Sequence, residues 1–430
     1  MVFYMEAKKL QMYSQDELRE ALKETKDAYD AFQAKGLSLN MARGVPGTDQ
    51  LDLTAAMLDA FPSDASPLSE SCDVRNYGVL TGIAEAKKLF ADILGADPDE
   101  MFIAGNSSLE LMFTCLQISF VRGIAGCEPW CRQEKIKFLC PVPGYDRHFA
   151  VSGYFGAEMI PVPTDENGPD MEMVKQYVEN DPAVKGIWCV PVFANPTGIV
   201  YSDETVRAFA ALKPAAKDFR IFWDNAYCIH TLADLPKAPL TINQACAEAG
   251  NPDIFWQFMS TSKITFPGAG VAAMNTSKAN MQEFVKAIGI MTIGYDKVNQ
   301  LRHVRFFGNA ENMREHMKKH RALLVPKFNT VLNKLNEEIA PLGIASWTNP
   351  KGGYFISFNG PKGTAKRIVQ LCKEGGVTLT GAGATYPNGN DPDDSNIRIA
   401  PTFPSVEKLA QAMELFCICV KLAALEQLVK

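Results

Sequence analysis

The sequence predicts an α/β fold, in which a large domain built on a mostly parallel sheet is joined to a smaller α+β domain. Three observations support this prediction. Short apolar runs alternate with helix-like stretches over roughly 200 residues, as in a parallel sheet covered by helices on both faces. After Lys278 the sequence becomes charged and helix-favouring, and short strand signals return later. A length of 430 residues suits two domains.

The first elements precede the sheet. Residues 15–35 place apolar residues at helical spacing among charged ones, so a helix is expected to end near Gly36. Residues 40–47 hold two glycines and a proline and are expected to form a loop. The strands expected to build the sheet are 135–140, 157–162, 186–191, 221–224, 254–259 and 271–275. Helices are expected between most of them, for example at 109–118 and 205–212.

The later elements belong to the smaller domain. Residues 278–338 are expected to be helical, with Pro326 as the main interruption. Strand signals at 354–358 and 397–400 and a final helix at 406–429 follow. We therefore place the large domain at residues 48–300, and the small domain at residues 1–47 and 301–430, with a long helix joining the two.

Composition and charge narrow the classes of function. Apolar residues make up 47% of the chain and charged residues 21%, so it can bury large cores. The net charge of −6 is spread without long blocks of one sign, which argues against a nucleic-acid partner. No uninterrupted apolar run reaches the ~18 residues of a membrane span, and the first residues lack a secretion signal. We expect a soluble, cytoplasmic enzyme with no membrane partner.

The cysteines indicate neither disulfides nor a metal site. There are eleven, mostly at apolar strand-like or helix-like positions. Cys127 and Cys131 are close in sequence, but no second Cys or His pair at zinc-ligand spacing follows them. Reduced, buried thiols and no bound metal are therefore expected.

Polar residues stand at the ends of the expected strands, where parallel sheets bind ligands. Ser107 and Ser108 open a helix, whose N–H groups and dipole could hold a phosphate, although both are also ordinary N-cap residues. Asn195 lies in the turn-like sequence Asn-Pro-Thr-Gly after one strand. Asp224 closes another strand, where a buried carboxylate needs a cationic partner. Lys263 follows a third strand, and its side chain could equally be solvated.

Together these residue types match the needs of one cofactor. Pyridoxal phosphate requires a phosphate cradle, a lysine for a Schiff base, an acid opposite the pyridine nitrogen, and donors to its phenolic oxygen. The chain supplies such residues in the order Ser107, Ser108, Asn195, Asp224, Tyr227 and Lys263. Between Asp224 and Lys263 there is room for one helix and one strand.

On Asn-Pro-Thr-Gly, Asp-x-x-Tyr and Ser-x-Ser-Lys in this order, the chain resembles the fold type I pyridoxal-phosphate aminotransferases of class I/II. Among them it is most similar to the bacterial aspartate aminotransferases of subgroup Ic. The likeness extends over residues 37–404. It implies a large domain with a mostly parallel sheet of the seven-stranded type, a smaller α+β domain, and pyridoxal 5'-phosphate as the cofactor.

The resemblance also implies a role for each residue. Lys263 would form the Schiff base and move the substrate α-proton. Asp224 would keep the pyridine nitrogen protonated, and Asn195 and Tyr227 would donate to the phenolic oxygen. Tyr145 would stack on the ring, or else be a core or turn tyrosine. The residues implied around the phosphate are Ser107, Ser108, Ser260 and Ser262.

Three further residues are matched outside the cofactor. Arg398 resembles the arginine that grips the substrate α-carboxylate, since a planar guanidinium suits a bidentate contact, and a surface salt bridge is the alternative. Gly44 resembles a loop residue whose backbone meets the same carboxylate. Tyr77 resembles a tyrosine that reaches the phosphate of the neighbouring subunit. The resemblance therefore implies a homodimer with shared active sites.

One departure from the family pattern leaves two questions open. The wider family has an arginine shortly after the Schiff-base lysine, which grips the phosphate, but Lys263 is followed by Ile-Thr-Phe-Pro-Gly-Ala-Gly-Val. The helix dipole, the serines or a basic residue from elsewhere must then neutralise the phosphate. The basic candidates are Lys297, Arg302 and Arg305, which could instead form a solvated helix face. The candidates for binding a second substrate carboxylate are Arg43, Arg147, Lys297 and Arg302.

We expect an aminotransferase that takes an L-amino acid and a 2-oxo acid as substrates, with 2-oxoglutarate as the acceptor and, on subgroup likeness alone, L-aspartate as the donor. An alanine or aromatic donor remains open, as does a lyase or decarboxylase, because the reaction depends on which α-carbon bond stands perpendicular to the ring. A transcriptional regulator on this scaffold would need a DNA-binding module, and only about 40 residues precede the Arg43–Gly44 loop. A non-catalytic protein would not be expected to keep Lys263, Asp224 and Arg398 in order.

Overall fold

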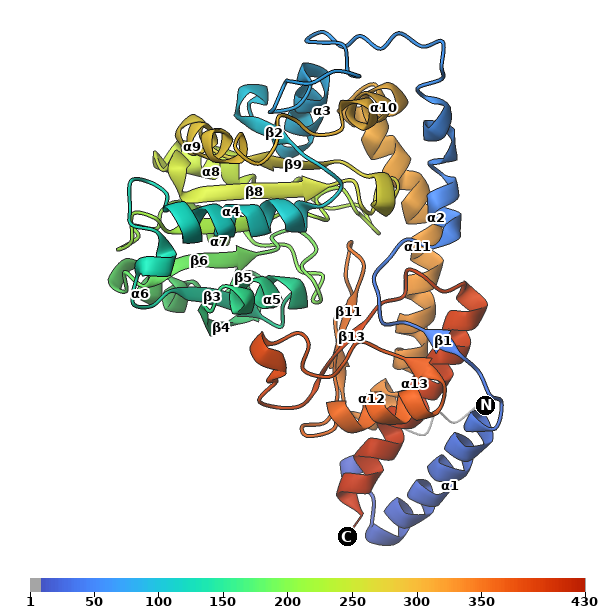
Figure 1. The fold of residues 1–430 in the computed structure, drawn as a ribbon. Helices are drawn as coiled ribbons and strands as arrows, with labels where there is room; N and C mark the ends of the chain where they lie inside the picture. Colours follow the sequence, from blue (N-terminus) through green and yellow to red (C-terminus); the bar gives the residue numbers. More distant parts are fainter. Residues whose placement is uncertain (1–8, 430) are drawn as a thin grey trace.

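The computed structural model describes residues 9–429, and its largest feature is an eight-stranded sheet (Figure 1). The strand order is β2-β9-β8-β7-β6-β3-β4-β5. The strands from β8 to β4 in this order are parallel, whereas β9 is antiparallel to both neighbours and β5 is antiparallel to β4. The strands are β2 (Met101–Ile103), β3 (Lys137–Val142), β4 (Glu158–Asp165), β5 (Gly168–Pro169), β6 (Val184–Cys189), β7 (Arg220–Asp224), β8 (Phe255–Ser260) and β9 (Ala272–Asn275).

The predicted α/β fold with a mostly parallel sheet is confirmed, and each expected strand overlaps an observed one, from β3 to β9. The structure adds β2 and β5, which have three and two residues and are too short to leave an alternating pattern in the sequence. The two-residue β5 accounts for the difference between the seven-stranded type and the eight strands observed.

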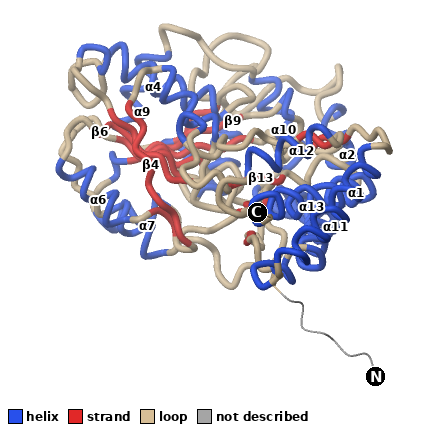
Figure 2. The backbone as a smooth tube through the Cα atoms, turned by 90° about the horizontal axis from the view of Figure 1, so that it is seen from below, coloured by secondary structure: helices blue, strands red, loops and turns tan. Residues whose placement is uncertain are grey.

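Both faces of the sheet are buried, which explains why its strands read as continuous apolar runs. In β7, Phe222 packs on one face while Ile221 and Trp223 pack on the other, as the two-residue period of a strand requires. Burying a side chain such as Phe222 stabilises the fold by about 1.5–3 kcal/mol. Helices cover the two faces as layers (Figure 2). One layer holds α4 (Ser108–Arg122), α5 (Asp146–Tyr154) and α9 (Lys278–Ile288), and the other holds α6 (Met171–Asn180), α7 (Asp203–Ala210) and α8 (Ile242–Ala249).

A second group of elements packs around its own apolar core, seen at the lower right of Figure 1. It contains a three-stranded sheet in the order β10-β11-β13 and a parallel pair of β1 and β12. The strands are β1 (Leu39–Asn40), β10 (Ser346–Trp347), β11 (Ile356–Asn359), β12 (Val377–Thr378) and β13 (Asn396–Ile399), and the helices are α1 (Gln15–Gln33), α12 (Ala365–Glu374) and α13 (Val406–Leu428). The expected helices at both ends of the chain and the strands at 354–358 and 397–400 are thus present.

The prediction that Pro326 interrupts a long helical region is wrong. The breaks instead follow α9 and lie at Gly308, between α10 (Lys297–Phe307) and α11 (Ala310–Glu338). Helix α11 continues through Pro326 although an interior proline costs ~3 kcal/mol. Leu324 and Phe328 on either side of it are buried in the second core, and this packing outweighs the local cost.

Helix α11 links the two parts of the molecule. Met313 and Met317 near its start pack with α3 (Ala84–Leu94) beside the large sheet, whereas Leu324 and Val331 belong to the second core. The division into residues 48–300 and 1–47 with 301–430 stays a prediction.

Three general properties complete the fold. Among residues 9–429, no helix combines the length and apolar character needed to cross a membrane. Within the same range, no three His, Cys, Asp or Glu side chains gather as ligands for a metal ion. The eleven cysteines are free thiols, and burial raises the pKa of those in the core, such as Cys115.

Candidate active site

A cavity of about 280 Å³ opens at the carboxyl ends of the parallel strands. Of the twelve residues that the family resemblance assigns to the cofactor or the substrate, all but two line it: Gly44, Ser107, Ser108, Tyr145, Asn195, Asp224, Tyr227, Ser260, Ser262 and Lys263. The exceptions are Tyr77 and Arg398.

The topology explains this convergence. Asp224 is the last residue of β7 and Ser260 is the last residue of β8, while Asn195 and Tyr145 lie in the segments that follow β6 and β3. Because these strands are parallel neighbours, the residues at their carboxyl ends meet at one edge of the sheet. Gly44 reaches the same cavity from the loop that precedes the short helix α2 (Thr48–Asp52).

One wall of the cavity is a polar cradle at the start of α4. Ser107 is the N-cap, and its hydroxyl accepts the N–H of Glu110 at 3.3 Å. Ser262 donates to the carbonyl of Asn106 at 3.2 Å and accepts from Ser260 at 3.0 Å, which ties the helix start to the end of β8. Hydroxyl groups beside the positive end of a 15-residue helix form a site that suits a phosphate dianion.

The amine of Lys263 lies between aromatic rings. Its Nζ is 5.1 Å from the ring centroid of Tyr227 and 5.9 Å from that of Tyr354. Desolvation in the cavity lowers the pKa of Lys263, the charge of Asp224 opposes this shift, and that of Arg398 adds to it. A lysine with a lowered pKa carries more of the neutral amine that acts as nucleophile or base.

The carboxylate of Asp224 is buried and only half satisfied. Its Oδ2 accepts a hydrogen bond from His148 Nε2 at 3.0 Å, and the His148 ring stacks on Trp188 with centroids 4.5 Å apart. Its Oδ1 has no hydrogen-bond partner. An unpartnered buried carboxylate oxygen is costly, so a donor from a bound ligand would be strongly favoured there.

Sequence reasoning predicted a cationic partner for Asp224 but did not identify His148. The one available signal was its position three residues after Tyr145, which places both on the same side of α5. The two rings meet edge to face with centroids 4.9 Å apart.

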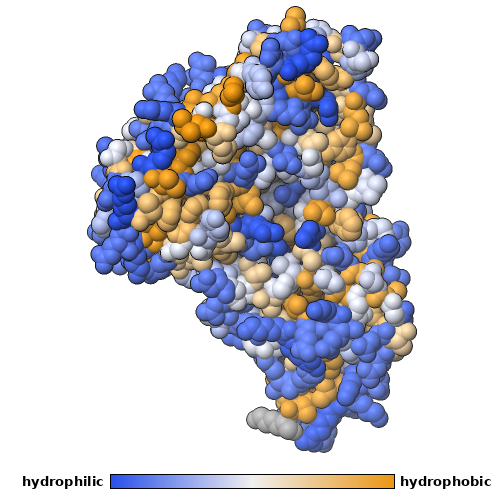
Figure 3. All heavy atoms as spheres, in the orientation of Figure 1, coloured by the Kyte–Doolittle hydropathy of each residue, from blue (hydrophilic) through white to orange (hydrophobic). Residues whose placement is uncertain are grey.

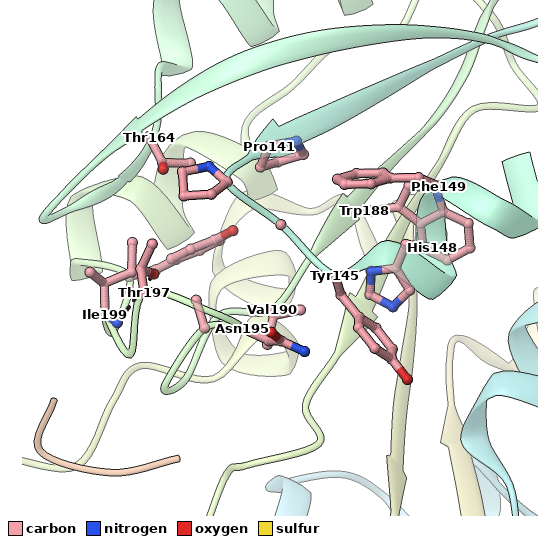
Figure 4. Close-up of a pocket in the computed structure, with 14 residues that line it drawn as sticks. Pro141, Tyr145, His148, Phe149, Thr164, Trp188, Val190, Asn195, Thr197 and Ile199 are labelled. Atoms are coloured by element: carbon pink, nitrogen blue, oxygen red, sulfur yellow. Dashed lines mark hydrogen bonds between the residues drawn. The ribbon is translucent and has the colours of Figure 1, made fainter. Parts of the chain in front are cut away.

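A smaller cavity adjoins the site on the side of Tyr145 (Figure 4). The rings of Tyr145, His148 and Trp188 lie together along one side of it, and Asn195 and Thr197 line the other. Burial raises the pKa of Tyr145 to about 12, and it also raises the pKa of Tyr227 far above its usual value. Both phenols therefore remain protonated and able to donate at neutral pH.

Arg398 stands behind the cavity rather than in its wall. It belongs to β13 and is buried, with its guanidinium 4.9 Å from the ring centroid of Phe355. Its Nη1 donates to Asp146 at 2.8 Å and to Asn195 at 3.3 Å, and its Nε has no partner. Asn195 thus connects Arg398 to the cavity. Asp146 and Phe355 were not predicted from the sequence, because no motif in the neighbouring sequence indicates that either residue contacts Arg398.

Tyr77 is not brought to this cavity. Its side chain is 83% exposed and lines a second cavity together with residues 291–298. Lys297 is buried at that second cavity, and Arg305 donates to the carbonyl of Ser66. Arg302 has an unpartnered Nε, and like Lys297 and Arg305 it is not part of the Lys263 cavity.

The residues proposed to bind a second substrate carboxylate are also not in the wall. Arg43 and Arg147 are exposed next to the lining residues Gly44 and Tyr145, and neither lines the cavity itself. Among the described residues of the lining, Lys263 is the one basic side chain.

Comparisons of the sequence and of the structure with known proteins point to one family. Residues 13–430 match the family described as aspartate amino-transferase. The aspartate aminotransferase of Corynebacterium glutamicum is 46% identical over 403 residues, covering 93% of both chains. The crystal structure of an aspartate transaminase from Corynebacterium glutamicum superposes with a TM-score of 0.95 at 44% identity and covers 98% of this chain and 99% of that one. The aspartate aminotransferase of Thermus thermophilus with maleate shares the fold at 17% identity, with a TM-score of 0.68 over 93% and 96% of the two chains.

Proposed function

Since this chain belongs to the aspartate amino-transferase family, we propose that it transfers the amino group of L-aspartate to 2-oxoglutarate with pyridoxal 5'-phosphate as its cofactor. The predicted fold, that of the fold type I aminotransferases, is confirmed by the same comparisons. The observation that carries the proposal is the pairing, in one cavity, of a lysine with a lowered pKa and a buried carboxylate with an unpartnered oxygen.

The residues present fit the cofactor. The unpartnered Oδ1 of Asp224 offers an acceptor for a protonated pyridine nitrogen, and His148 holds the other oxygen in place. The start of α4, with Ser107, Ser108, Ser260 and Ser262, suits the phosphate. The bound cofactor supplies an electron sink for the negative charge that develops at the substrate α-carbon.

The protein's own side chains do the remaining work. Lys263 Nζ, with its pKa lowered by burial, would take the proton from the α-carbon of the amino donor and pass it on within the same half-reaction, and in the second half it would return a proton to the α-carbon of the acceptor. Tyr227, Asn195 and Tyr145 line the cavity, where the first two would donate to the ring oxygen of the cofactor and the third would pack beside its ring.

We propose that Arg398 binds the substrate α-carboxylate. Its guanidinium is buried, and one of its donors, Nε, is free of partners. Because Asn195 contacts both Arg398 and the cavity, a carboxylate placed there would lie next to the cofactor residues. The backbone of Gly44 lines the same cavity and would approach this carboxylate from the other side.

We also propose a cytoplasmic homodimer in which Tyr77 serves the neighbouring site. Its side chain is exposed and does not line the cavity of its own chain. On the face shown in Figure 3, hydrophobic side chains gather over the helices that cover the large sheet. Ile290, Met291 and Ile293, which directly follow α9, are exposed apolar residues that a subunit contact would cover.

An absorption titration of the holoenzyme with L-aspartate tests the proposal. The visible band of the lysine-bound cofactor should be replaced by the band of its amino form, and adding 2-oxoglutarate should restore it. Substituting Lys263→Ala should abolish turnover while the far-ultraviolet circular dichroism spectrum stays unchanged. A band that does not respond to L-aspartate would exclude this donor, and turnover retained by Lys263→Ala would exclude the mechanism.

A further inference from the structure

Most histidines of this protein surround the turn that carries Lys263. The chain has five, and all are buried. One of them, His148, holds Asp224. The other four, called here the histidine cage, contact residues 261–265 directly or through one another. They are His230, His303, His316 and His320.

The cage meets a single amide at Gln50, whose side chain is fully buried in α2. Its Oε1 accepts the backbone N–H of Gly47 at 3.2 Å. Its Nε2 donates to the hydroxyl of Tyr354 at 2.9 Å and lies 3.2 Å from Nδ1 of His320. Gln50 therefore connects the loop that ends at Gly47, the helix α11 and the residue Tyr354.

The Gly47 contact sets the direction of the hydrogen bonds that Gln50 makes to Tyr354 and His320. A backbone N–H can only donate, so the oxygen of the Gln50 amide must face Gly47 and the NH₂ group must face Tyr354 and His320. The hydroxyl of Tyr354 then accepts from Gln50, which leaves its own proton for the carbonyl of Lys263 at 3.5 Å. The same carbonyl accepts from Nε2 of His230 at 3.3 Å.

The direction continues to His320. Its Nδ1 accepts from Gln50, so a neutral His320 carries its proton on Nε2. This Nε2 lies 3.1 Å from Nε2 of His316. The same nitrogen of His316 also lies 3.1 Å from the carbonyl of Ile264, which can only accept, so Gln50 fixes the tautomer of His320 but not that of His316.

We propose that Gln50 is a positioning residue for Lys263, acting through Tyr354 and the histidine cage. The proposal rests on the proposed function, because Lys263 is the residue assigned there to move the substrate proton. Gly44, Val45 and Pro46 of the loop before Gly47 line the same cavity as Lys263. One buried amide thus fixes both the loop on the substrate side and the turn that presents the amine.

The first test reads the hydrogen-bond directions in the cofactor-free protein, with no reference to activity. Nitrogen chemical shifts of ¹⁵N-histidine-labelled protein distinguish the two imidazole tautomers, and single-histidine variants assign the signals. We expect His320 to carry its proton on Nε2. The opposite tautomer at His320 would overturn the proposal, whether or not the protein uses L-aspartate.

The second test is Gln50→Glu. This variant keeps the size of the side chain and the oxygen that accepts from Gly47, and it replaces the donating NH₂ group by a second acceptor. The carboxylate can only accept, so it should capture the Tyr354 proton and place a proton on Nδ1 of His320. Lys263 then loses one carbonyl contact, and we expect kcat to fall about tenfold to a hundredfold with KM within about twofold. The matched control is Gln244→Glu, because Gln244 occupies the same third position of helix α8 but is exposed.

Tyr354→Phe separates positioning from general damage, since it removes only the hydroxyl between Gln50 and Lys263. If Gln50 acts through Tyr354, adding Gln50→Glu to Tyr354→Phe should lower kcat by less than Gln50→Glu does alone. Turnover is followed with whichever amino donor converts the cofactor. A kcat within twofold of the unsubstituted enzyme for both single variants would overturn the proposal, and so would fully additive losses.

Discussion

At the scale of single residues, the behaviour of Lys263 depends on two opposed effects. Removal from water lowers the pKa of its amine, and the nearby carboxylate of Asp224 raises it. The net effect lowers the pKa, so at a given pH the amine is neutral more often than that of a solvated lysine. Asp224 can exert this effect because His148 satisfies only one of its two oxygens. The same carboxylate therefore tunes the lysine and remains available to a ligand.

Substituting Asp224→Asn tests this arrangement. The amide keeps an oxygen for His148 but has no charge to stabilise a protonated nitrogen, so we expect kcat to fall at least about a hundredfold. The pKa of Lys263 should move further down, because the carboxylate charge of Asp224, which raises it, is lost. Steady-state kinetics and the pH dependence of kcat/KM check both effects.

A matched control is Asp218→Asn, which alters another buried carboxylate far from the cavity lining. Asp218 pairs with Lys185 at 2.8 Å. Its substitution leaves a buried lysine unpaired and should lower stability by about 3–5 kcal/mol, with kcat within about twofold. Equal losses of kcat in the two variants would contradict a special role for Asp224.

Individual residues of the candidate site could be predicted from the sequence only where a polar side chain comes at the end of an apolar strand. Asn195, Asp224 and Lys263 each follow an apolar run, and the parallel topology brings them together. The supporting residues were not predictable, because their neighbours come from distant parts of the chain. Gln50 and His320 are an example, since they are separated by 270 positions.

At the scale of elements, long apolar strands were predicted well and short or strongly packed elements poorly. Strands β6 and β7 are buried on both faces, and such continuous apolar runs stand out in any sequence. Strand β12 has two residues and leaves no pattern of its own. Helix α11 was misjudged at Pro326, because local propensity does not include the packing of its neighbours on the second core.

Substituting Pro326→Ala measures how much the interior proline of α11 lowers the stability of the protein. Alanine restores an N–H for the preceding turn and removes the clash of the ring, at the cost of a more flexible unfolded chain. We expect the free energy of unfolding to rise by about 1–2 kcal/mol in urea denaturation. Lys319→Ala, an exposed change in the same helix, should shift it by less than about 0.5 kcal/mol. A loss of stability in Pro326→Ala would show that the helix needs the proline.

At the scale of the whole molecule, the two cores meet through α11 and through the cage around Lys263. On α11, His316 lies between Met313 and Met317, which pack beside the large sheet, and His320 lies between Met317 and Leu324, where the second core begins. His230 follows β7, and Tyr354 precedes β11. The turn that carries Lys263 is therefore held by elements from both parts of the molecule, so its geometry and the stability of the fold depend on the same neutral imidazoles.

These imidazoles predict how stability changes with pH. Burial lowers the pKa of His230 to about 3, with Lys263 and His320 adding to the shift, and lowers those of His303 and His320 to about 4. Unfolded histidines titrate near the ordinary value of 6.5. Between these limits the unfolded chain binds more protons than the folded one, so the stabilisation is complete above pH 6.5 and is lost as pH falls.

Each of these histidines should lower the free energy of unfolding by about 1.4 kcal/mol per pH unit once the pH is well below 6.5. The carboxylate of Asp73, whose pKa is about 2, titrates below this range. Urea denaturation from pH 8 to 4.5 should therefore show a plateau and then a steep decline. His303→Gln removes one titrating group while keeping an amide near Thr265, and it should reduce the slope near pH 5 by about 1.4 kcal/mol per unit. An unchanged slope would mean that His303 is already protonated in the folded protein, and that the turn carrying Lys263 is held by charged rather than neutral histidines.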